Sequence, residues 1–331
     1  MNSGYTDISR QSADTSPLHA DVRQRPLVAV VGPTGSGKSD LALHLAELFH
    51  GEIVNCDSLQ VFRHFDIGTA KLSVGEQRGI PHHLIDIIDP GALFTAGEFA
   101  RLARDTIADI SSRGALPIVA GGTGFYLRAL VDGLFAGPSR DQDLRDRLAA
   151  RERRRAGSLH RLLARFDREA ASKIHPNDVP KVTRALEVCL LTRRPVSELF
   201  RAGRDALRGY RVLKLGLLPD RDLLYTRVDV RCAAMFEQGL ADEVKHILSL
   251  GFSGAEKPFE SVGYKQALQF VRGELNLRDA IFYAQRDTRN YAKRQLTWFR
   301  REPGLVWLKG FGDEEKIREK AAHAVSEVLK S

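Results

Sequence analysis

The residues best suited to chemistry lie in a glycine-rich segment, 32–39, that directly follows the apolar run 27–31. Glycines let the backbone wrap around a phosphate chain, and the N–H groups at the start of the next helix attract the phosphate oxygens. Lys38 supplies a positive charge for the terminal phosphate, and the Ser39 hydroxyl can ligate Mg²⁺. An ordinary glycine-rich turn is the alternative. The strand–loop–helix context favours a phosphate-binding P-loop formed by Gly32, Pro33, Thr34, Gly35, Ser36, Gly37, Lys38 and Ser39.

A second group of polar residues follows the expected strand 52–56 and begins with Asp57. In a doubly wound sheet this segment is expected beside the P-loop. Asp57 could then serve as a Mg²⁺ ligand or as a base for a substrate. Capping of a following helix is the alternative, because Asp is favoured at that position. The residues alone leave these three roles open.

The expected strand 116–120 ends differently from the matching strand of a motor or switch ATPase. Such an ATPase carries an acidic residue there, which binds Mg²⁺. Here the strand continues into Gly121, Gly122, Thr123 and Gly124, and no acid is present. Two consecutive glycines permit a ligand to approach the backbone closely. Thr123 can donate to a phosphate or a base, and capping of the next helix is its simpler role.

Neither a histidine or zinc site, nor a calcium loop, nor a disulfide framework is predicted. His82 and His83 precede an expected strand without a partner at ligand spacing, so packing or capping is favoured. The acidic run 141–143 lacks the Gly and Glu of a calcium loop. The three cysteines lack CxxC spacing and are too few for a disulfide scaffold; they are Cys56, Cys189 and Cys232.

Apolar segments alternate with helical patterns through most of the chain. Strands are expected at 27–31, 52–56, 83–88, 116–120, 212–218 and 305–308, and helices at 41–48, 96–112, 222–250 and 279–300. This alternation predicts an α/β fold, with a P-loop NTPase-like parallel sheet and helices on both faces. No apolar run reaches the roughly 18–20 residues that span a bilayer, so no membrane association is expected.

The net charge of +8 is concentrated in one internal segment. Residues 138–211 hold 19 Lys and Arg against 10 Asp and Glu, so this segment carries +9 and the rest of the chain carries −1. Apolar residues recur in it at helical spacing, which predicts an inserted all-helical domain between two parts of the core, 25–137 and 212–331. A basic insertion suggests a polyanionic partner; a solvated arginine-rich surface is the alternative.

The first 24 residues are polar and lack apolar periodicity, which predicts a disordered tail at 1–24. The tail has no apolar stretch like that of a secretory signal. Its acidic residues argue against an organelle transit peptide. An intracellular, cytoplasmic location is therefore expected.

Eight motifs in order resemble those of the bacterial tRNA dimethylallyltransferase (tRNA isopentenyltransferase) family. The resemblance covers roughly residues 26–310, and the motifs are Gly32–Ser39, Asp57–Phe62, Asp66–Lys71, Pro81–Leu84, Gly121–Leu127, Ile174–Asp178, Ser261–Lys265 and Ala292–Phe299. It implies transfer of a dimethylallyl group from dimethylallyl diphosphate to N6 of adenosine 37 in tRNAs that read codons starting with U. The P-loop would then hold the diphosphate of the prenyl donor rather than ATP, with Mg²⁺ as the cofactor.

The resemblance also implies roles for single residues. Asp57 would accept the proton of the adenine amino group, and Thr123 would belong to the catalytic set. Lys38, Mg²⁺ and Arg231 would stabilise the leaving diphosphate; a helix-surface arginine is the alternative for Arg231.

The basic insertion would bind the tRNA anticodon stem-loop, and the enzyme would be a monomer. The tRNA-binding residues that the resemblance implies are Asp57, Ser58, Leu59, Gln60, Thr123, Arg145, Pro180, Lys181, Val182, Thr183, Arg184, Glu260, Ser261, Val262, Gly263, Tyr264 and Lys265.

Three positions depart from the usual family pattern. Ser39 replaces the commoner threonine and keeps the hydroxyl, whereas Leu59 and Phe62 stand where methionine or leucine and tyrosine are usual. Other functions remain open. A small-molecule P-loop kinase or an adenylate isopentenyltransferase would share the P-loop and the nearby acid without needing the insertion. An RNA-binding module with a vestigial P-loop would not need Lys38, Asp57 and Arg231 intact.

Overall fold

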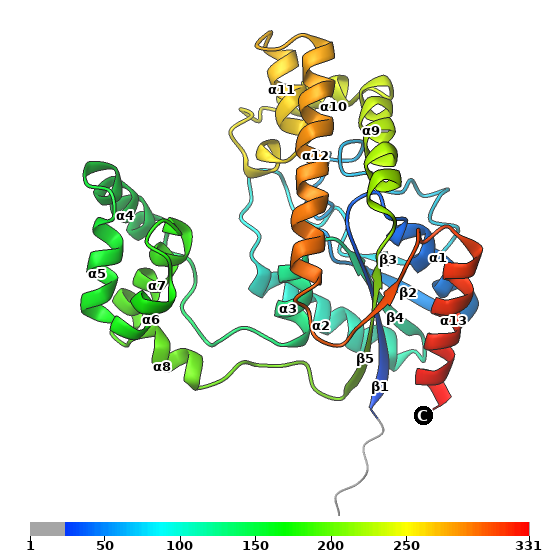
Figure 1. The fold of residues 1–331 in the computed structure, drawn as a ribbon, viewed down its shortest axis with the longest axis horizontal. Coiled ribbons are helices and arrows are strands. Elements are labelled where there is room, and N and C mark those ends of the chain that lie inside the picture. Colours follow the sequence, from blue (N-terminus) through cyan, green and yellow to red (C-terminus); the bar gives the residue numbers. More distant parts are fainter. Residues whose placement is uncertain (1–23, 331) are drawn as a thin grey trace, which may run out of the picture.

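The computed structural model describes residues 24–330, so the predicted tail at 1–24 lies, except for Gln24, outside the described residues. Six parallel strands form one sheet in the order β3-β2-β4-β1-β5-β6 (Figure 1). Their bounds are β1 Arg25–Val31, β2 Gly51–Asn55, β3 His82–His83, β4 Leu116–Gly121, β5 Tyr210–Leu217 and β6 Leu305–Leu308. The predicted α/β class with a parallel sheet is confirmed.

Alternating side chains of the central strand β1 build the two layers of core. Val28 and Val30 pack with α1 and α13 on one face, and Leu27, Ala29 and Val31 pack with α2, α3 and the end of α12 on the other. These helices are α1 Lys38–Phe49, α2 Ala96–Ser112, α3 Gly124–Val131, α12 Leu277–Phe299 and α13 Glu315–Lys330. Successive strand residues point to opposite faces, so an unbroken apolar run is buried on both sides.

A second layer of helices stands over the carboxyl end of the sheet (Figure 1). It contains α9 Arg221–Glu237, α10 Leu240–Ser249, the 3₁₀ helix η1 Lys257–Glu260, α11 Tyr264–Val271 and the first part of α12. Its core includes Phe65, whose aromatic ring contacts the rings of Phe259 and Tyr264. The prediction of one helix over 222–250 is wrong, because Gly239 adopts a φ of +99° and separates α9 from α10.

The basic segment forms a separate group of five helices, which Figure 1 shows beside the sheet. They are α4 Gln142–Arg154, α5 Ser158–Phe166, α6 Arg168–Lys173, α7 Val179–Thr192 and α8 Val196–Arg201. Asp141, Asp167 and Asp178 cap α4, α6 and α7 with their carboxylates, each accepting a backbone N–H. The five helices enclose a core of their own, in which Leu163 and Leu186 are completely buried.

The two chain segments that join these helices to the sheet lie side by side. Phe135 and Arg204 form an antiparallel bridge, and Leu207 donates its N–H to the Val131 carbonyl at 2.9 Å. The Arg104 guanidinium on α2 binds both the carboxylate and the carbonyl of Asp205. The helical group is therefore held through a short paired connection.

Two expectations about the strands need correction. The predicted strand 83–88 is wrong, because β3 is only two residues long and Leu84 and Asp86 have φ of +62° and +54°, which turn the chain. The expected strand 212–218 begins earlier, at Tyr210, which pairs with Arg25. β4 lies between β2 and β1, so the segment that begins with Asp57 follows a strand that is not the direct neighbour of β1.

Within residues 24–330, no helix combines the length and the apolarity needed to cross a membrane.

Candidate active site

The loop between β1 and α1 has the backbone geometry that its glycines predict. Gly35 and Gly37 have φ of +81° and +82°, in the left-handed region that other residues rarely adopt. A Cβ on Gly37 would lie 2.8 Å from the nitrogen of Gly312. Gly312 in turn donates its N–H to the Ser36 carbonyl at 2.9 Å. The C-terminal segment therefore packs directly against the P-loop and limits its shape.

Two cations lie at this loop, and both are largely removed from water. Burial lowers the pKa of Lys38 to about 8, while the Asp57 carboxylate opposes the shift and Arg231 adds to it. The Lys38 ammonium donates to the Pro33 carbonyl at 2.8 Å. Arg231 donates to the Thr34 hydroxyl, and burial lowers its pKa as well. Poorly solvated cations of this kind bind a phosphate group strongly.

Arg231 is not the surface arginine that was the alternative. Its Nε is buried and has no hydrogen-bond partner among the described residues. A buried donor without a partner is rare and costly in a protein, so a missing acceptor is the simplest account of it. An anion bound at the P-loop would supply that acceptor.

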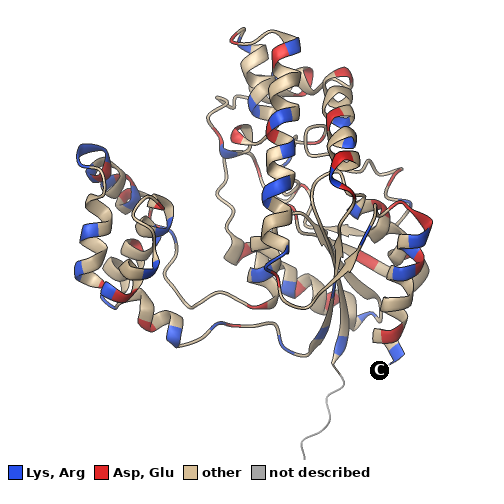
Figure 2. Cartoon of the chain, in the orientation of Figure 1, with Lys and Arg blue, Asp and Glu red and all other residues tan. Residues whose placement is uncertain are grey.

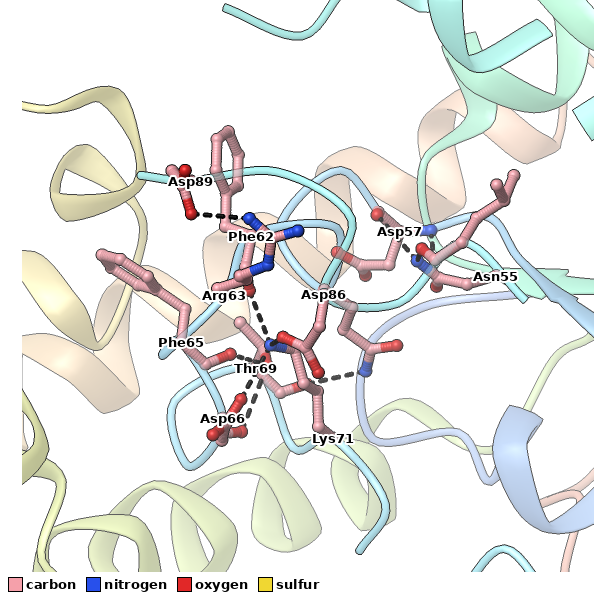
Figure 3. Close-up of polar contacts among 12 residues, drawn as sticks. Asn55, Asp57, Phe62, Arg63, Phe65, Asp66, Thr69, Lys71, Asp86 and Asp89 are labelled. Carbon is pink, nitrogen blue, oxygen red and sulfur yellow. Dashed lines mark hydrogen bonds and ion pairs between the residues drawn. The ribbon is translucent and has the colours of Figure 1, made fainter. Parts of the chain in front are cut away.

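Asp57 is held by the residues on either side of it (Figure 3). The buried Asn55 side chain accepts the Asp57 N–H at 3.0 Å and donates to the Leu84 carbonyl, also at 3.0 Å. Asp57 Oδ1 accepts the Leu59 N–H at 2.9 Å, which closes an Asx turn. Only turns and β3 separate β2 from α2 in the structure. The helix-capping role for Asp57 is therefore wrong, and one carboxylate oxygen caps a turn instead.

Lys71 organises the long loop that follows Asp57 (Figure 3). Its side chain is only 5% exposed. The ammonium donates to the Phe62 carbonyl at 2.6 Å and binds the carboxylates of Asp66 and Asp86 at 2.7 and 2.5 Å. A buried cation whose donors are satisfied in this way ties distant parts of the loop together.

Thr123 connects this loop to the end of β4. It occupies the N-cap position of α3, but its side chain makes no capping hydrogen bond. The Thr123 hydroxyl instead accepts the Ser58 N–H at 3.1 Å and lies 3.3 Å from the Ser58 hydroxyl. The side-chain capping role is wrong, and the contact with Ser58 brings Thr123 next to Asp57.

These elements surround a cavity of about 380 Å³. Its polar lining includes Thr34, Asp57, Ser58, Arg231, Glu260, Ser261 and Arg294. Its apolar lining includes Phe62, Phe94, Tyr126, Met235, Phe236 and Leu240. A cavity with a buried arginine beside the P-loop, a carboxylate and a large apolar wall suits a substrate that joins a phosphate group to a hydrocarbon.

Comparisons with known proteins show which family this chain belongs to. The model of the IPP transferase family matches residues 60–302. A tRNA dimethylallyltransferase of Solibacter usitatus is 77% identical over 92% of this chain and 99% of its own length. The corresponding protein of Koribacter versatilis is 55% identical over 88% of this chain and 95% of its own. The chain belongs to the IPP transferase family.

Solved structures similar to this IPP transferase agree with the fold. A tRNA isopentenylpyrophosphate transferase from Bacillus halodurans is 37% identical, with a TM-score of 0.68 over 93% of this chain and 99% of its own. A eukaryotic dimethylallyltransferase acting on tRNA is 29% identical, with a TM-score of 0.79 over 92% of this chain and 79% of its own. The predicted family is therefore confirmed by sequence and by structure.

The structure brings one set of the predicted residues of this IPP transferase to a common cavity. Those that line it are Thr34, Asp57, Ser58, Leu59, Arg231, Glu260, Ser261, Val262 and Gly263. Gln60 lies beside it and donates to the carbonyl of Thr69, which also lines the cavity. Tyr264 is completely buried and accepts the Gly68 N–H, whereas Lys265 is exposed.

Six of the predicted tRNA-binding residues lie in the helical group, away from this cavity. Pro180 and Lys181 are exposed, Thr183 is partly buried, and Val182 is buried in the core of the group. Arg145 binds the buried Glu187 with two hydrogen bonds of 2.8 Å, and Arg184 binds the same carboxylate at 2.5 Å. Burial opposes ionisation of Glu187, but the hydrogen bonds from these arginines outweigh it and lower its pKa to about 2. Both predicted tRNA ligands therefore also hold this group together.

Sequence reasoning assigned no role to Asn55, Gln295 or Trp298, although the last two belong to a quoted motif. Gln295 accepts the Thr34 N–H at 2.8 Å and donates to the Gly122 carbonyl at 2.9 Å. Trp298 lies against Gly124, where a Cβ would come within 2.1 Å of its ring. The consecutive small residues after β4 were the available signal, because they leave room for side chains of α12.

A second hollow of about 640 Å³ runs along α12. It is lined by Arg128, Asn290, Lys293, Arg294, Thr297, Trp298 and Arg301. Figure 2 shows basic bands along α12 and on the helices of the basic segment. This hollow, here called the α12 groove, places four cations next to each other with no acidic residue in its lining.

Proposed function

We propose that this protein transfers a dimethylallyl group from dimethylallyl diphosphate to N6 of adenosine 37 in tRNAs that read codons starting with U. The observation that carries the proposal is the shared cavity, in which Thr34 and Arg231 of the phosphate side face the same space as Asp57. An apolar wall completes it, as a prenyl chain requires. The relatives named tRNA dimethylallyltransferase support the same reaction.

On the donor side, the P-loop and the two buried cations bind the diphosphate. The C–O bond of the donor breaks as the new C–N bond forms, and negative charge grows on the departing diphosphate. Lys38 and Arg231 stabilise that charge in a poorly solvated site, where electrostatic interactions are strong. Thr34 contributes its hydroxyl, which already accepts from Arg231.

On the acceptor side, the adenine amino group is a weak nucleophile, because its lone pair is delocalised into the ring. A carboxylate that takes its proton as the C–N bond forms overcomes this weakness. The Leu59 N–H tethers one oxygen of Asp57 and leaves the other for the amino group. Adenosine 37 must leave the stacked anticodon loop to reach this carboxylate.

The residues at the P-loop also suit Mg²⁺. Mg²⁺ usually takes one or two protein ligands and completes its shell with water and substrate phosphates. One residue fits this pattern, because Ser39 offers a hydroxyl at the start of α1. Bound there, Mg²⁺ would neutralise charge on the diphosphate.

The tRNA would contact two basic surfaces. One is the insertion, residues 138–211, which carries +9 and includes the exposed Pro180 and Lys181. The other is the α12 groove, whose cations can bind RNA phosphates. The insertion would bind the anticodon stem-loop while residues 260–263 and Asp57 meet the extruded base. A monomeric, cytoplasmic enzyme is part of this proposal.

The test is incubation of the full chain with labelled dimethylallyl diphosphate, Mg²⁺ and one of three acceptors: tRNA, AMP, or a small molecule with ATP. We expect label in tRNA alone. Nuclease digestion and mass spectrometry should locate it on adenosine 37, and a transcript with guanosine at that position is the matched control. Sedimentation of the labelled complex reports whether one protein chain binds one tRNA.

The two alternatives give different products. Prenylated AMP with unmodified tRNA would identify an adenylate isopentenyltransferase, and transfer of phosphate from ATP would identify a small-molecule kinase. Either result would refute the proposal. Retained transfer after complete removal of divalent cations by a chelator would refute the Mg²⁺ part alone.

A further inference from the structure

We propose that Gln295 is a positioning residue, which aligns the diphosphate-binding loop with the loop that holds the acceptor side of the site. The inference rests on the proposed function, because alignment matters only if donor and acceptor react between these two loops. Gln295 lies on α12, far along the chain from both, and the residue is only 6% exposed.

The contacts of Gln295 begin where the sheet ends. Strands β1 and β4 are neighbours, and their ladder ends with the pair Val31 and Gly121. Just beyond it, Gln295 accepts the Thr34 N–H at 2.8 Å and donates to the Gly122 carbonyl at 2.9 Å. The Gln295 side-chain amide thus links the two loops just beyond the point where the backbone hydrogen bonds between β1 and β4 end.

Each loop leads from Gln295 to a group of the reaction. On the P-loop, Thr34 carries the hydroxyl to which Arg231 donates. On the other loop, Gly122 precedes Thr123, whose hydroxyl accepts the N–H of Ser58, the neighbour of Asp57. Gln295 therefore lies in the middle of a chain of contacts. The chain runs from Arg231, the cation proposed to bind the diphosphate, to Asp57, the proposed base.

The geometry accepts few substitutes for Gln295. The Thr34 N–H and the Gly122 carbonyl demand one acceptor and one donor, so only one orientation of the amide satisfies both. A Cβ on Gly122 would lie 2.3 Å from Gln295 Nε2, so a side chain at 122 would displace the amide. Because an error of about 1 Å in the alignment of reacting groups can cost about 100-fold in rate, this contact should control turnover.

The closing experiment uses Gln295→Glu, which keeps the size of the side chain. An ionised carboxylate can accept the Thr34 N–H, but its second oxygen opposes the Gly122 carbonyl. A protonated carboxyl can donate to that carbonyl and restore both hydrogen bonds. Burial raises the pKa of such a carboxyl, so the protonated form returns as the pH falls through that raised value.

We expect kcat of Gln295→Glu at saturating substrates to fall about 100-fold near neutral pH, with KM for dimethylallyl diphosphate and tRNA within about threefold of wild type. The ratio of variant to wild-type kcat should rise as the pH is lowered. Gly122→Ala displaces the Gln295 amide by adding a methyl group on the other side of the contact. It should lower kcat without changing the pH profile. Thermal melting of every variant reports folding separately.

Gln285→Glu is the matched control. It places the same substitution on the same helix, where Gln285 donates to the Asp229 carbonyl at 3.1 Å and contacts neither loop. We expect wild-type kcat from it. Near-normal kcat of a folded Gln295→Glu at every pH, or a loss confined to KM, would overturn the positioning role. Absence of tRNA prenylation by the wild-type protein would instead refute the proposed function.

Discussion

The cavity and the insertion hold their charged side chains in opposite ways. Beside the cavity, the charged groups of the P-loop and of the loop after Asp57 are enclosed: burial removes Lys38 and Arg231 from water, and the Lys71 side chain is 5% exposed and lies between two carboxylates. In the insertion most basic side chains lie in solvent, such as Lys181, whose side chain is 73% exposed. Glu187, with its two arginines, is the buried exception.

The two arrangements suit two different functions, placement of reacting groups and binding of phosphates. A side chain that is fixed by several hydrogen bonds can place a reacting group accurately, and such placement contributes to the rate of the chemical step. Exposed cations act through their number, because each phosphate that they neutralise releases counterions and strengthens binding. Substitutions around the cavity should therefore change kcat, and substitutions on the basic surfaces should change tRNA affinity and its dependence on salt.

The largest expected effect is that of Asp57→Ala. Loss of the base should lower kcat by about 10³-fold, within the range of general base catalysis, while tRNA affinity changes little. Single-turnover transfer and filter binding measure the two quantities. Asp57→Asn, which keeps the turn with Leu59, is the control for local structure and should be equally inactive. Near-normal turnover in either variant would remove Asp57 from the reaction.

Substitutions in the α12 groove should change tRNA affinity rather than kcat. Lys293→Gln combined with Arg301→Gln should raise the Kd for tRNA by roughly tenfold at low salt and reduce the slope of log Kd against log salt by about 2, one for each charge. kcat at saturating tRNA should stay close to wild type. Lys320→Gln, on the exposed surface of α13, is the control and should change neither value. An unchanged salt slope in the double variant would exclude the groove as a tRNA surface.

The pH dependence of the P-loop should show a smaller but distinctive effect. Burial lowers the pKa of Lys38 to about 8, so the ammonium loses its proton as the pH rises through that value. kcat/KM for dimethylallyl diphosphate should therefore fall up to about tenfold per pH unit above about pH 8. The bound diphosphate favours the charged lysine, so kcat should fall at a higher pH. A profile of kcat/KM that stays flat to about pH 10 would contradict this role.

The smallest effect on catalysis is expected from Glu187→Gln. The hydrogen bonds from Arg145 and Arg184 lower the pKa of Glu187 to about 2, so its stabilisation is complete above the unfolded pKa near 4.5 and is lost as the pH falls toward 2. At neutral pH the free energy of unfolding of the variant should be lower by about 1–3 kcal/mol, which thermal melting detects as a lower Tm, and this difference should shrink in acid. kcat should remain near wild type. A large loss of kcat with normal stability would link the insertion to chemistry.

Local sequence was sufficient for the parts of the site that depend on neighbours in the chain. The P-loop glycines could be recognised from their spacing. In the structure, positive φ and close packing against Gly312 exclude a side chain at these positions. Asp57 could be placed at the end of a strand from the apolar run before it. The contacts that fix its position could not be predicted. Asn55, which holds Asp57, reaches the Leu84 carbonyl only when β2 pairs with β3.

The sequence by itself determined that the protein has a phosphate-binding loop, a parallel sheet and a basic helical segment, since each follows from spacing or composition within a short stretch. Tertiary structure alone decided what those parts do together. The strand order inserts β4 between β1 and β2, and the packing of α12 brings Gln295 to Thr34 across 261 residues. The same holds for Arg145 and Arg184, which count as free charges in the sequence but share the buried Glu187 in the fold. Contacts of this length depend on how strands and helices pack, and no local pattern records that choice.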